Sequence, residues 1–367
     1  MENIQNNIET DFLNNFHYNQ KDNYNWDIIS ISKDNENKRS VLFCGINKQD
    51  KNDCIFVKRI KLDFSSEIFI KEILNEVYFL VLLKNQKYFV QISDILLDNE
   101  NNFNFIYLVF KGNYISLDKL INSKENIYLS NKDLIKWIIY QITFGLYVLH
   151  SNNIIHNNIK PSNILINEIA GITICDLGSA VYMGENSFTY TQYYSPPEFL
   201  YNNNNINREY NSDMWSLGII IIELLLKKNR YFKLNNGEKT NEEQLQKILS
   251  RFGVNENIQS EEIKRLLEDN SNTLKFKFTD EELKEIQDKD VIDLVQNLLV
   301  LNPNKRFTAK QVLMSEYLSK IFGVIDSLDI KNLEKPINYN YDLLGQIDRN
   351  KFLEKIIILS SKLNELK

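Results

Sequence analysis

Cysteine is scarce in this 367-residue chain, which contains only Cys44, Cys54 and Cys175. An odd and sparse set without zinc-ligand spacing argues against a disulfide framework and against a structural metal site. Such usage suits a reducing compartment. We therefore expect the protein to act in the cytoplasm or the nucleus.

Long hydrophobic runs and basic clusters are also missing. The most apolar stretch, Trp215–Leu226, is too short to cross a bilayer and contains Glu223. The first twenty residues lack the apolar segment of a secretory signal. No block rich in lysine and arginine stands out, and the formal net charge is −6. This balance disfavours nucleic acid and membrane surfaces as partners and leaves other proteins.

Glycine and proline number only 11 and 5, so their positions carry information. The first glycine in the chain is Gly45. Hydrophobic residues make up 43% of the chain, enough for a sizeable core, and the length fits one large domain or two lobes.

The first part of the chain reads as mostly β-structure. Between Trp26 and Ile60, short bursts rich in Ile, Val and Phe alternate with polar turns, which predicts a strand meander. Apolar residues at helical spacing predict one helix over Ser65–Asn85. Two more strands are expected at 88–95 and 103–110.

After Gly112 the pattern becomes helical, which predicts a hinge near Phe110–Asn113. The expected helices are Asn131–Asn153, Asn211–Leu226, Asn241–Phe252, Glu261–Glu268, Asp290–Leu301 and a C-terminal helix from Arg349. The sequence thus predicts an α+β fold. Its parts are a polar extension (1–24), a β-rich lobe (25–112), a helical lobe (113–320) and a tail (321–367) that packs on the domain formed by the two lobes.

One segment, Ile154–Asn167 (IIHNNIKPSNILIN), resembles the catalytic loop of protein kinases, whose pattern is H-R-D-L-x-x-x-N. His156, Lys160 and Asn163 stand at the matching positions. Downstream, ICDLGSA is similar to the D-F-G segment and YYSPPEFL to A-P-E. Upstream, CIFVKRI is similar to V-A-I-K.

Two further segments, SDMWSLG and NPNKRFTAKQVL, complete the resemblance and supply Asp213 and Arg306 as anchors. In this family the arginine pairs with the glutamate of A-P-E, here Glu198. Six motifs in the family's order span roughly residues 26–320, and the fold this implies is the bilobal kinase fold. The chain resembles most the branch that contains cyclin-dependent and MAP kinases, and its tail is similar to a MAP-kinase tail.

The resemblance implies ATP and Mg²⁺ as cofactors and assigns roles to the retained residues. Lys58 and Glu76 would form the ion pair that positions phosphates, Asp176 and Asn163 would hold the metal, and Lys160 would reach the γ-phosphate. The base would lie beside the gatekeeper and hinge residues and over a floor residue. These are Phe110, Lys111, Asn113 and Leu165.

Each assignment has a structural alternative. The Lys58–Glu76 pair could serve only to brace a helix, and Asp176 could serve only to cap a turn. His156 reads as a buried packing histidine and Cys175 as a small pocket-wall hydrophobe.

Four positions depart from the family pattern. Asn158 stands at the position of the catalytic-loop aspartate. Its amide cannot take a proton, and loss of a general base costs ~10²–10⁴ in rate. Asn157 stands at the position of the preceding arginine, which in the family binds a phosphorylated activation segment. That segment still offers hydroxyl groups for phosphorylation, at Ser187, Thr189, Tyr190 and Thr191.

The other two departures concern the nucleotide. The glycines of the phosphate loop are replaced by Asn35, Asn37 and Ser40, whose side chains hinder close backbone approach. Phe56 stands at the position of the alanine that lies over the adenine, and overpacking of that kind costs ~1–3 kcal/mol unless neighbours move. The favoured alternative is that Phe56 packs as a core residue in an empty pocket. ATP and Mg²⁺ binding is therefore in doubt on the sequence alone.

The sequence favours an inactive kinase, a pseudokinase that acts as a binding or scaffold protein. Two alternatives stay open. One is a weak or atypical serine/threonine kinase that relies on Lys58, Asn163 and Asp176. The other is a nucleotide-binding switch that binds ATP without transferring phosphate.

Overall fold

The computed structural model describes most of the chain between residues 26 and 366. The described ranges are 26–31, 40–47, 54–99, 103–123, 128–185, 192–201, 209–234, 240–255, 258–269, 271, 274–322 and 347–366. These residues form two compact units. The first holds the described residues up to Gln86, then Val90–Asn113 and the C-terminal helix, and the second holds Lys87–Phe89 and the described residues from Tyr114 to Phe322.

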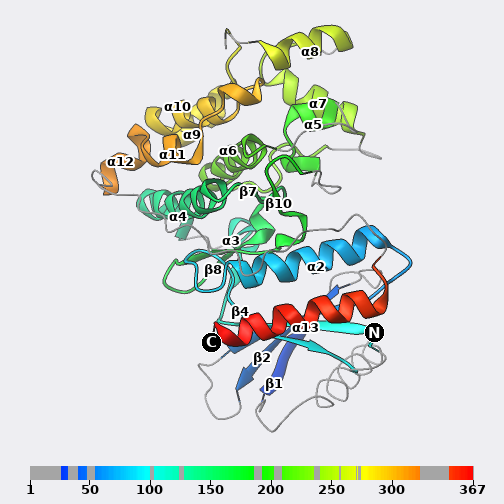
Figure 1. Cartoon of the computed structure of the whole chain (residues 1–367). Helices are drawn as coiled ribbons and strands as arrows, with labels where there is room; N and C mark the ends of the chain where they lie inside the picture. Colours follow the sequence, from blue (N-terminus) through cyan, green and yellow to red (C-terminus); the bar gives the residue numbers. More distant parts are fainter. Residues whose placement is uncertain are drawn as a thin grey trace. The chain divides into compact units, whose positions relative to one another are not determined.

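The first unit is built on an antiparallel five-stranded sheet in the order β1-β2-β3-β5-β4 (Figure 1). Its strands are β1 (Trp26–Ile31), β2 (Ser40–Asn47), β3 (Cys54–Lys61), β4 (Ile92–Leu97) and β5 (Phe105–Lys111). Alternate residues point to opposite faces of such a sheet. One face therefore carries the core cluster Phe43, Ile55, Val57, Tyr107 and Val109. The other face carries Phe56 and Lys58.

Two helices belong to the same unit. Helix α2 (Glu67–Leu82) is buried along most of its length, and α13 (Arg349–Glu365) packs against α2 and β4 although it lies at the far end of the chain. Phe352 on α13 anchors this contact, since its ring lies 5.6 Å from that of Phe64 and 5.9 Å from that of Phe103. Arg349 also donates a hydrogen bond of 2.7 Å to the carbonyl oxygen of Phe103.

The second unit is mainly helical. Its longer helices are α4 (Lys132–Ser151), α6 (Asn211–Leu226), α7 (Asn241–Ser250), α8 (Ser260–Glu268) and α10 (Lys289–Leu298), and its shorter ones are α3 (Leu117–Ile121), α5 (Pro197–Tyr201), α9 (Asp280–Ile286), α11 (Ala309–Leu313) and α12 (Glu316–Phe322). Helix α6 is buried nearly all round, as its apolar sequence predicts. Helix α4 begins where expected, because Asn131 accepts hydrogen bonds from the amides of Asp133 and Leu134.

Short strands hold the loops that carry the motifs. Strands β6 (Ile115–Ser116), β8 (Ile164–Ile166) and β9 (Ile172–Ile174) form one small sheet, and β7 (Ile154–Ile155) pairs with β10 (Val181–Tyr182) in another. The catalytic-loop segment therefore lies between β7 and β8, and the ICDLGSA segment lies between β9 and β10.

The structure confirms the predicted strand meander and each of the predicted helices, with ends that shift by up to three residues. One strand was misplaced, because β4 occupies Ile92–Leu97 and not the predicted 88–95. Sequence reasoning did not predict α3, α5, α9, α11 and α12. None of the helices in the described part of the chain is both long and apolar enough to cross a membrane.

Candidate functional site

The first group of predicted site residues lies in the first unit, where Lys58 on β3 meets Glu76 on α2. The Lys58 ammonium lies 2.6 and 2.8 Å from the two carboxylate oxygens of Glu76. The side chain of Glu76 is 8% exposed and that of Lys58 is 24% exposed. This partly buried pair ties the helix to the sheet, so the geometry is consistent with a bracing role and with the family's phosphate-positioning role alike.

Phe56 shares the face of β3 that carries Lys58. Its cross-strand neighbours are Cys44 on β2 and Phe110 on β5. In the family a methyl group occupies this position, whereas here an aromatic ring stands between a thiol and a second aromatic ring. The Phe56 side chain is half-buried, and its ring is much larger than the methyl group that the resemblance places at this position.

The remaining predicted residues of the first unit are placed only in part. Ser40 is the first residue of β2, whereas Asn35 and Asn37 lie outside the described residues. Phe110 and Lys111 end β5, and Asn113 is the last residue of the segment Val90–Asn113 of this unit.

In the second unit, Asp213 at the start of α6 accepts hydrogen bonds from the backbone of the catalytic-loop segment. One oxygen of the buried Asp213 carboxylate accepts from the backbone N–H of His156 at 2.9 Å and lies 3.0 Å from Nε2 of His150. The other oxygen accepts from the backbone N–H of Asn157 at 2.9 Å. Asp213 is thus an anchor of the loop backbone, as the motif predicts.

His156 is a buried packing residue in this structure. Burial is the largest influence on its pKa and lowers it, which favours the neutral imidazole. The backbone N–H of Asn158 points at Nδ1 at 3.3 Å, so Nε2 carries the proton and donates to the carbonyl oxygen of Cys175 at 3.1 Å. A histidine with both ring nitrogens engaged is not placed to act as a base.

Asn157 occupies the position where the family has arginine. Its backbone is left-handed, with φ of 61°, a conformation that asparagine tolerates better than most residues. The side-chain amide donates to the carbonyl oxygen of Ser179 at 3.2 Å. This short neutral side chain ties the loop to the segment after Asp176 and offers no charge to a phosphate.

Asn158 directs its side chain at Asp176. The Asn158 amide nitrogen lies 3.0 Å from Oδ2 of Asp176, and the amide nitrogen of Asn163 lies 3.0 Å from the same oxygen. Asn163 also donates to the backbone carbonyl of Asn158 at 2.8 Å. The structure thus brings together three predicted site residues in one part-buried network.

The backbone of Asp176 is left-handed, with φ of 64°, and it precedes a short 3₁₀ turn at Leu177–Ser179. Its side chain makes no capping hydrogen bond to that turn. The alternative in which Asp176 only caps a turn is therefore wrong. The carboxylate instead serves as acceptor for the two asparagine amides.

Lys160, Leu165 and Cys175 complete the group in the second unit. The carbonyl oxygen of Lys160 accepts from the backbone N–H of Asn163 at 2.9 Å, and the N–H of Cys175 donates to the carbonyl oxygen of Asn163 at 2.9 Å. Leu165 is the half-exposed residue of β8, between two buried isoleucines. These backbone bonds fix the position of Asn163 relative to Asp176.

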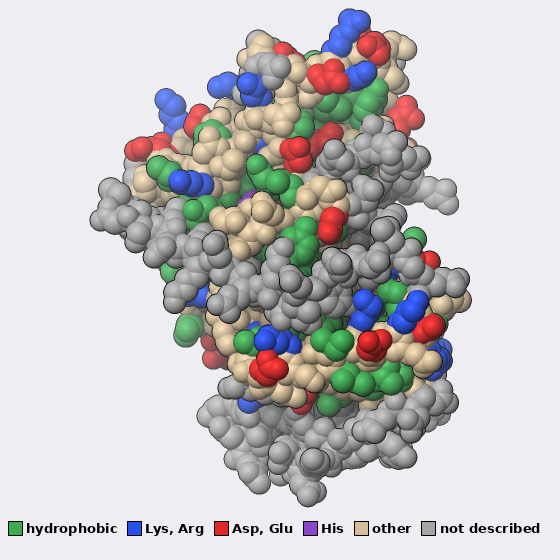
Figure 2. Space-filling view, in the orientation of Figure 1, with side chains coloured by type: hydrophobic (Ala, Val, Ile, Leu, Met, Phe, Trp, Pro, Cys, Tyr) green, Lys and Arg blue, Asp and Glu red, His purple; other side chains and the backbone are tan. Residues whose placement is uncertain are grey.

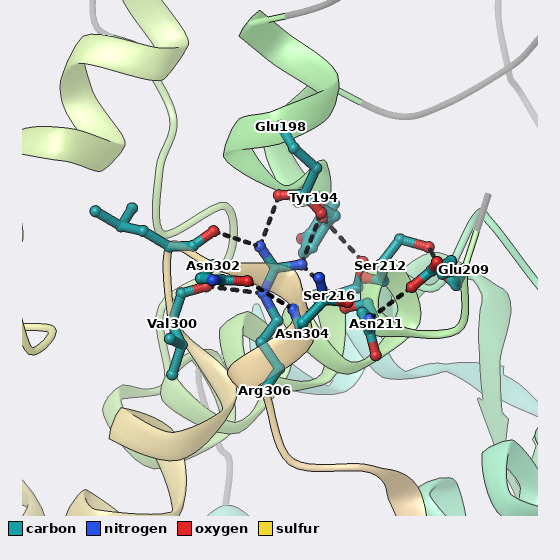
Figure 3. Close-up of polar contacts among 11 residues, drawn as sticks. Tyr194, Glu198, Glu209, Asn211, Ser212, Ser216, Val300, Asn302, Asn304 and Arg306 are labelled. Carbon is teal, nitrogen blue, oxygen red and sulfur yellow. Dashed lines mark hydrogen bonds and ion pairs between the residues drawn. The ribbon is translucent and has the colours of Figure 1, made fainter. Parts of the chain in front are cut away.

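Arg306 is held by an ion pair and by several hydrogen bonds to the backbone (Figure 3). Its guanidinium nitrogens lie 2.7 and 2.6 Å from the carboxylate oxygens of Glu198, which confirms the predicted pairing. The same group donates to three backbone carbonyl oxygens, those of Val300, Leu301 and Asn211. It also lies 4.9 Å from the ring centroid of Trp215.

A buried acid next to this network was not predicted to have a role. Glu223 on α6 has no exposed surface and accepts from the hydroxyl of Tyr194 and from the backbone N–H of Tyr231. Burial raises its pKa to about 7. The sequence signal was available, because Glu223 interrupts the most apolar run of the chain.

The donor set of the second unit fits a hard divalent cation only in part. Asp176 contributes carboxylate oxygens and Asn163 an amide oxygen, which are the ligand types that Mg²⁺ prefers. The amide nitrogen of Asn163 is already directed at protein acceptors, which leaves its oxygen for a ligand. When bound, the ion would offset the negative charge of phosphate groups. Asn158 adds an N–H donor at the position where the family supplies a second carboxylate.

A β-sheet unit with one bracing helix, a helical unit and these motif contacts define the class of protein: a protein kinase fold. The family model described as "Protein kinase domain" matches residues 40–318. The chain is 27% identical over 312 residues to mitogen-activated protein kinase 6 of Arabidopsis thaliana, covering 82% of this chain and 74% of that protein. It is 31% identical over 289 residues to mitogen-activated protein kinase HOG1 of Gibberella zeae, covering 76% and 75%.

The chain therefore belongs to the protein kinase family, and its relatives among the mitogen-activated protein kinases place it with the serine/threonine kinases. The predicted bilobal kinase fold is confirmed.

Proposed function

We propose that this protein is a kinase-fold binding protein that transfers phosphate negligibly and acts through other proteins. The observation that carries the proposal is the bond from the Asn158 amide to Asp176. In an active kinase this position presents a carboxylate that takes up or orients the proton of the substrate hydroxyl. Here it presents an amide with no basic atom, already committed as a donor.

Three further departures from the family pattern support the proposal. Asn157 supplies no positive charge for a phosphorylated activation segment, whose candidate acceptors (187–191) lie outside the described residues. Phe56 places an aromatic ring where the family keeps a methyl group. The phosphate-loop positions Asn35, Asn37 and Ser40 all carry side chains. Each change affects a different part of the phosphate-transfer reaction, so all of them lower its rate.

Two specific contacts favour the competing function, a weak serine/threonine kinase. The Lys58–Glu76 pair is formed, and Asn163 lies beside Asp176 in an arrangement that could hold Mg²⁺. Phosphoryl transfer depends mostly on positioning and electrostatics, so these groups alone could support slow turnover. A nucleotide-binding switch would use the same groups without transfer.

The partners we propose are proteins. On the face of the molecule shown in Figure 2, the described basic and acidic side chains are interspersed in the region of α2 and α13. Helix α13 covers part of α2, so the outer face of α2 is a smaller candidate surface than the sequence indicated. Exposed apolar residues on α13 and the surface of α7 and α8 are the remaining candidates. A reducing compartment, the cytoplasm or nucleus, suits three cysteines that form no disulfide bond.

Phosphotransfer from Mg-ATP to a general protein substrate tests the proposal, with Asp176→Asn as the matched background. That variant keeps the side-chain shape and removes the only carboxylate of the network. We expect the wild-type rate to equal the background set by this variant. A wild-type rate clearly above it would establish the weak-kinase function. Thermal unfolding with and without ATP then separates a nucleotide-binding switch from a protein that binds no nucleotide.

A further inference from the structure

The carboxylate of Asp176 accepts hydrogen bonds from two asparagine side chains. Its Oδ2 accepts one hydrogen bond from Asn158 and one from Asn163, each of 3.0 Å. A carboxylate can only accept hydrogen bonds, so the nitrogen end of each amide must face it. The two N–H dipoles therefore place partial positive charge next to Oδ2, whose negative charge a divalent cation would otherwise neutralise.

The same network joins the two loop segments on either side of β8 and β9. Asn163 donates to the carbonyl of Asn158, the N–H of Cys175 donates to the carbonyl of Asn163, and the ring of His156 donates to the carbonyl of Cys175. Asn157 adds the bond to Ser179. Each of these bonds joins two protein groups, and none of them needs a metal ion to form.

An aspartate in place of Asn158 would change this balance most directly. It would put a carboxylate oxygen where the amide nitrogen now lies, next to Oδ2 of Asp176. Two carboxylates in a part-buried site repel strongly, and the repulsion is relieved by protonation or by a divalent cation. With asparagine, neither is required.

We infer that Asn158 replaces the divalent cation as the charge-balancing partner of Asp176, so that segments 156–163 and 175–179 hold their conformation in the absence of metal. The inference rests on the proposed function, because a site that transfers phosphate uses the cation itself. It adds that the second unit keeps one loop conformation at any Mg²⁺ concentration. A protein partner that binds segments 156–163 and 175–179 would then bind them independently of Mg²⁺.

The test uses metal alone, without nucleotide, on the full chain. Thermal unfolding is measured in EDTA and in millimolar MgCl₂ for the wild type, Asn158→Asp, Asp176→Asn and the double variant. We expect no shift of the wild-type Tm with Mg²⁺. The Asn158→Asp variant should unfold several degrees lower in EDTA and recover most of that loss with Mg²⁺.

The double variant Asn158→Asp with Asp176→Asn keeps the test decisive if the single variant does not fold. It restores one carboxylate and one amide with donor and acceptor exchanged, so its Tm should again be independent of Mg²⁺. Asn297→Asp is the matched control, because the Asn297 amide donates to the exposed Asp293 carboxylate at 3.2 Å. There, water screens the new repulsion and the change in Tm should be small.

Hydrogen exchange of segments 156–163 and 175–179 gives a local readout in the same samples. Protection that is equal in EDTA and Mg²⁺ for the wild type, and metal-dependent only for Asn158→Asp, supports the inference. A wild-type Tm that rises with Mg²⁺ as much as that of the variant overturns it, as does a variant as stable as the wild type in EDTA. Since nucleotide is absent, either result leaves the phosphotransfer measurement to decide the proposed function separately.

Discussion

The hydroxyl of Tyr194 donates to both carboxylate oxygens of Glu223, at 3.2 and 3.0 Å, in a part of the core where Glu223 has no exposed surface. Burial raises the pKa of Glu223 to about 7, while the N–H of Tyr231, the Tyr194 hydroxyl and the nearby Arg230 oppose the rise. The folded protein therefore holds a proton on Glu223 at pH values where the unfolded chain has lost it.

This relationship makes the stability of the protein depend on pH. The contribution of Glu223 is fully present below the ordinary carboxyl pKa of 4.5 and is lost as the pH rises through about 7. The difference between these values corresponds to about 3 kcal/mol. Urea unfolding from pH 5 to pH 8 should show this decline in the wild type and a much smaller one in Glu223→Gln, whose side chain cannot titrate. Equal slopes for the two proteins would contradict the assignment.

Restoring the catalytic aspartate alone should not restore a kinase. We expect Asn158→Asp to show no strong phosphotransfer, because Phe56 and the side chains of the phosphate loop still oppose nucleotide binding. The measurement is single-turnover transfer from Mg-ATP, with Asn158→Asp compared with the same change combined with Phe56→Ala and glycines at Asn35, Asn37 and Ser40. Strong transfer by the single variant would show that the roof and loop changes are harmless.

Phe56 should control whether adenine nucleotides bind at all. Phe56→Ala restores the small side chain that the family has at this position, so ATP should raise the Tm of the variant more than that of the wild type. Phe105→Ala is a matched control, because Phe105 is also half-buried in this sheet but lies on the opposite face, against the core cluster. An ATP response that is equal in both variants would argue against a specific role for Phe56.

Arg306 should contribute more to stability than its ion-pair partner. Removing the buried Arg306 leaves Glu198 without its ion-pair partner and removes the hydrogen bonds that Arg306 donates to three backbone carbonyls, and losses of about 3–5 kcal/mol are typical for such a break. Glu198→Gln keeps an acceptor for the guanidinium and should cost less. Denaturant unfolding of Arg306→Met and Glu198→Gln measures the two losses, and an equal cost would mean that the carbonyl contacts contribute little.

The sequence predicted those features of the molecule that depend on local pattern. Helix α6 shows an unbroken apolar run, and the capping residue Asn131 marks the start of α4. The pairing of Arg306 with Glu198 was predicted because the motifs that contain them have fixed positions in the family. Strand β4 was placed too early, because Tyr88–Val90 is apolar like a strand yet belongs in part to the second unit.

Contacts that depend on tertiary placement could not be predicted. The sequence shows that Asn158 is no base, but only the structure shows that its amide bonds to Asp176. Glu223 was visible as an acid in an apolar run, while its partner Tyr194 lies 29 positions away in the chain. The C-terminal helix was predicted from its periodicity, whereas its packing against α2 depends on the fold of the whole first unit.

The packing of α13 on the first unit should be strongly dependent on Phe352. Its side chain is fully buried between the rings of Phe64 and Phe103, and Arg349 lies over both of those rings. Phe352→Ala removes a large buried side chain, for which losses of about 3–5 kcal/mol are usual. Ile357→Ala is the control on the same helix, since Ile357 is 55% exposed and should cost less than about 0.5 kcal/mol. Denaturant unfolding gives the two values, and hydrogen exchange of α2 shows whether its protection falls only in Phe352→Ala. If the two variants lose stability equally, α13 is not held by this aromatic contact, and the helix would be only loosely attached to the unit it covers.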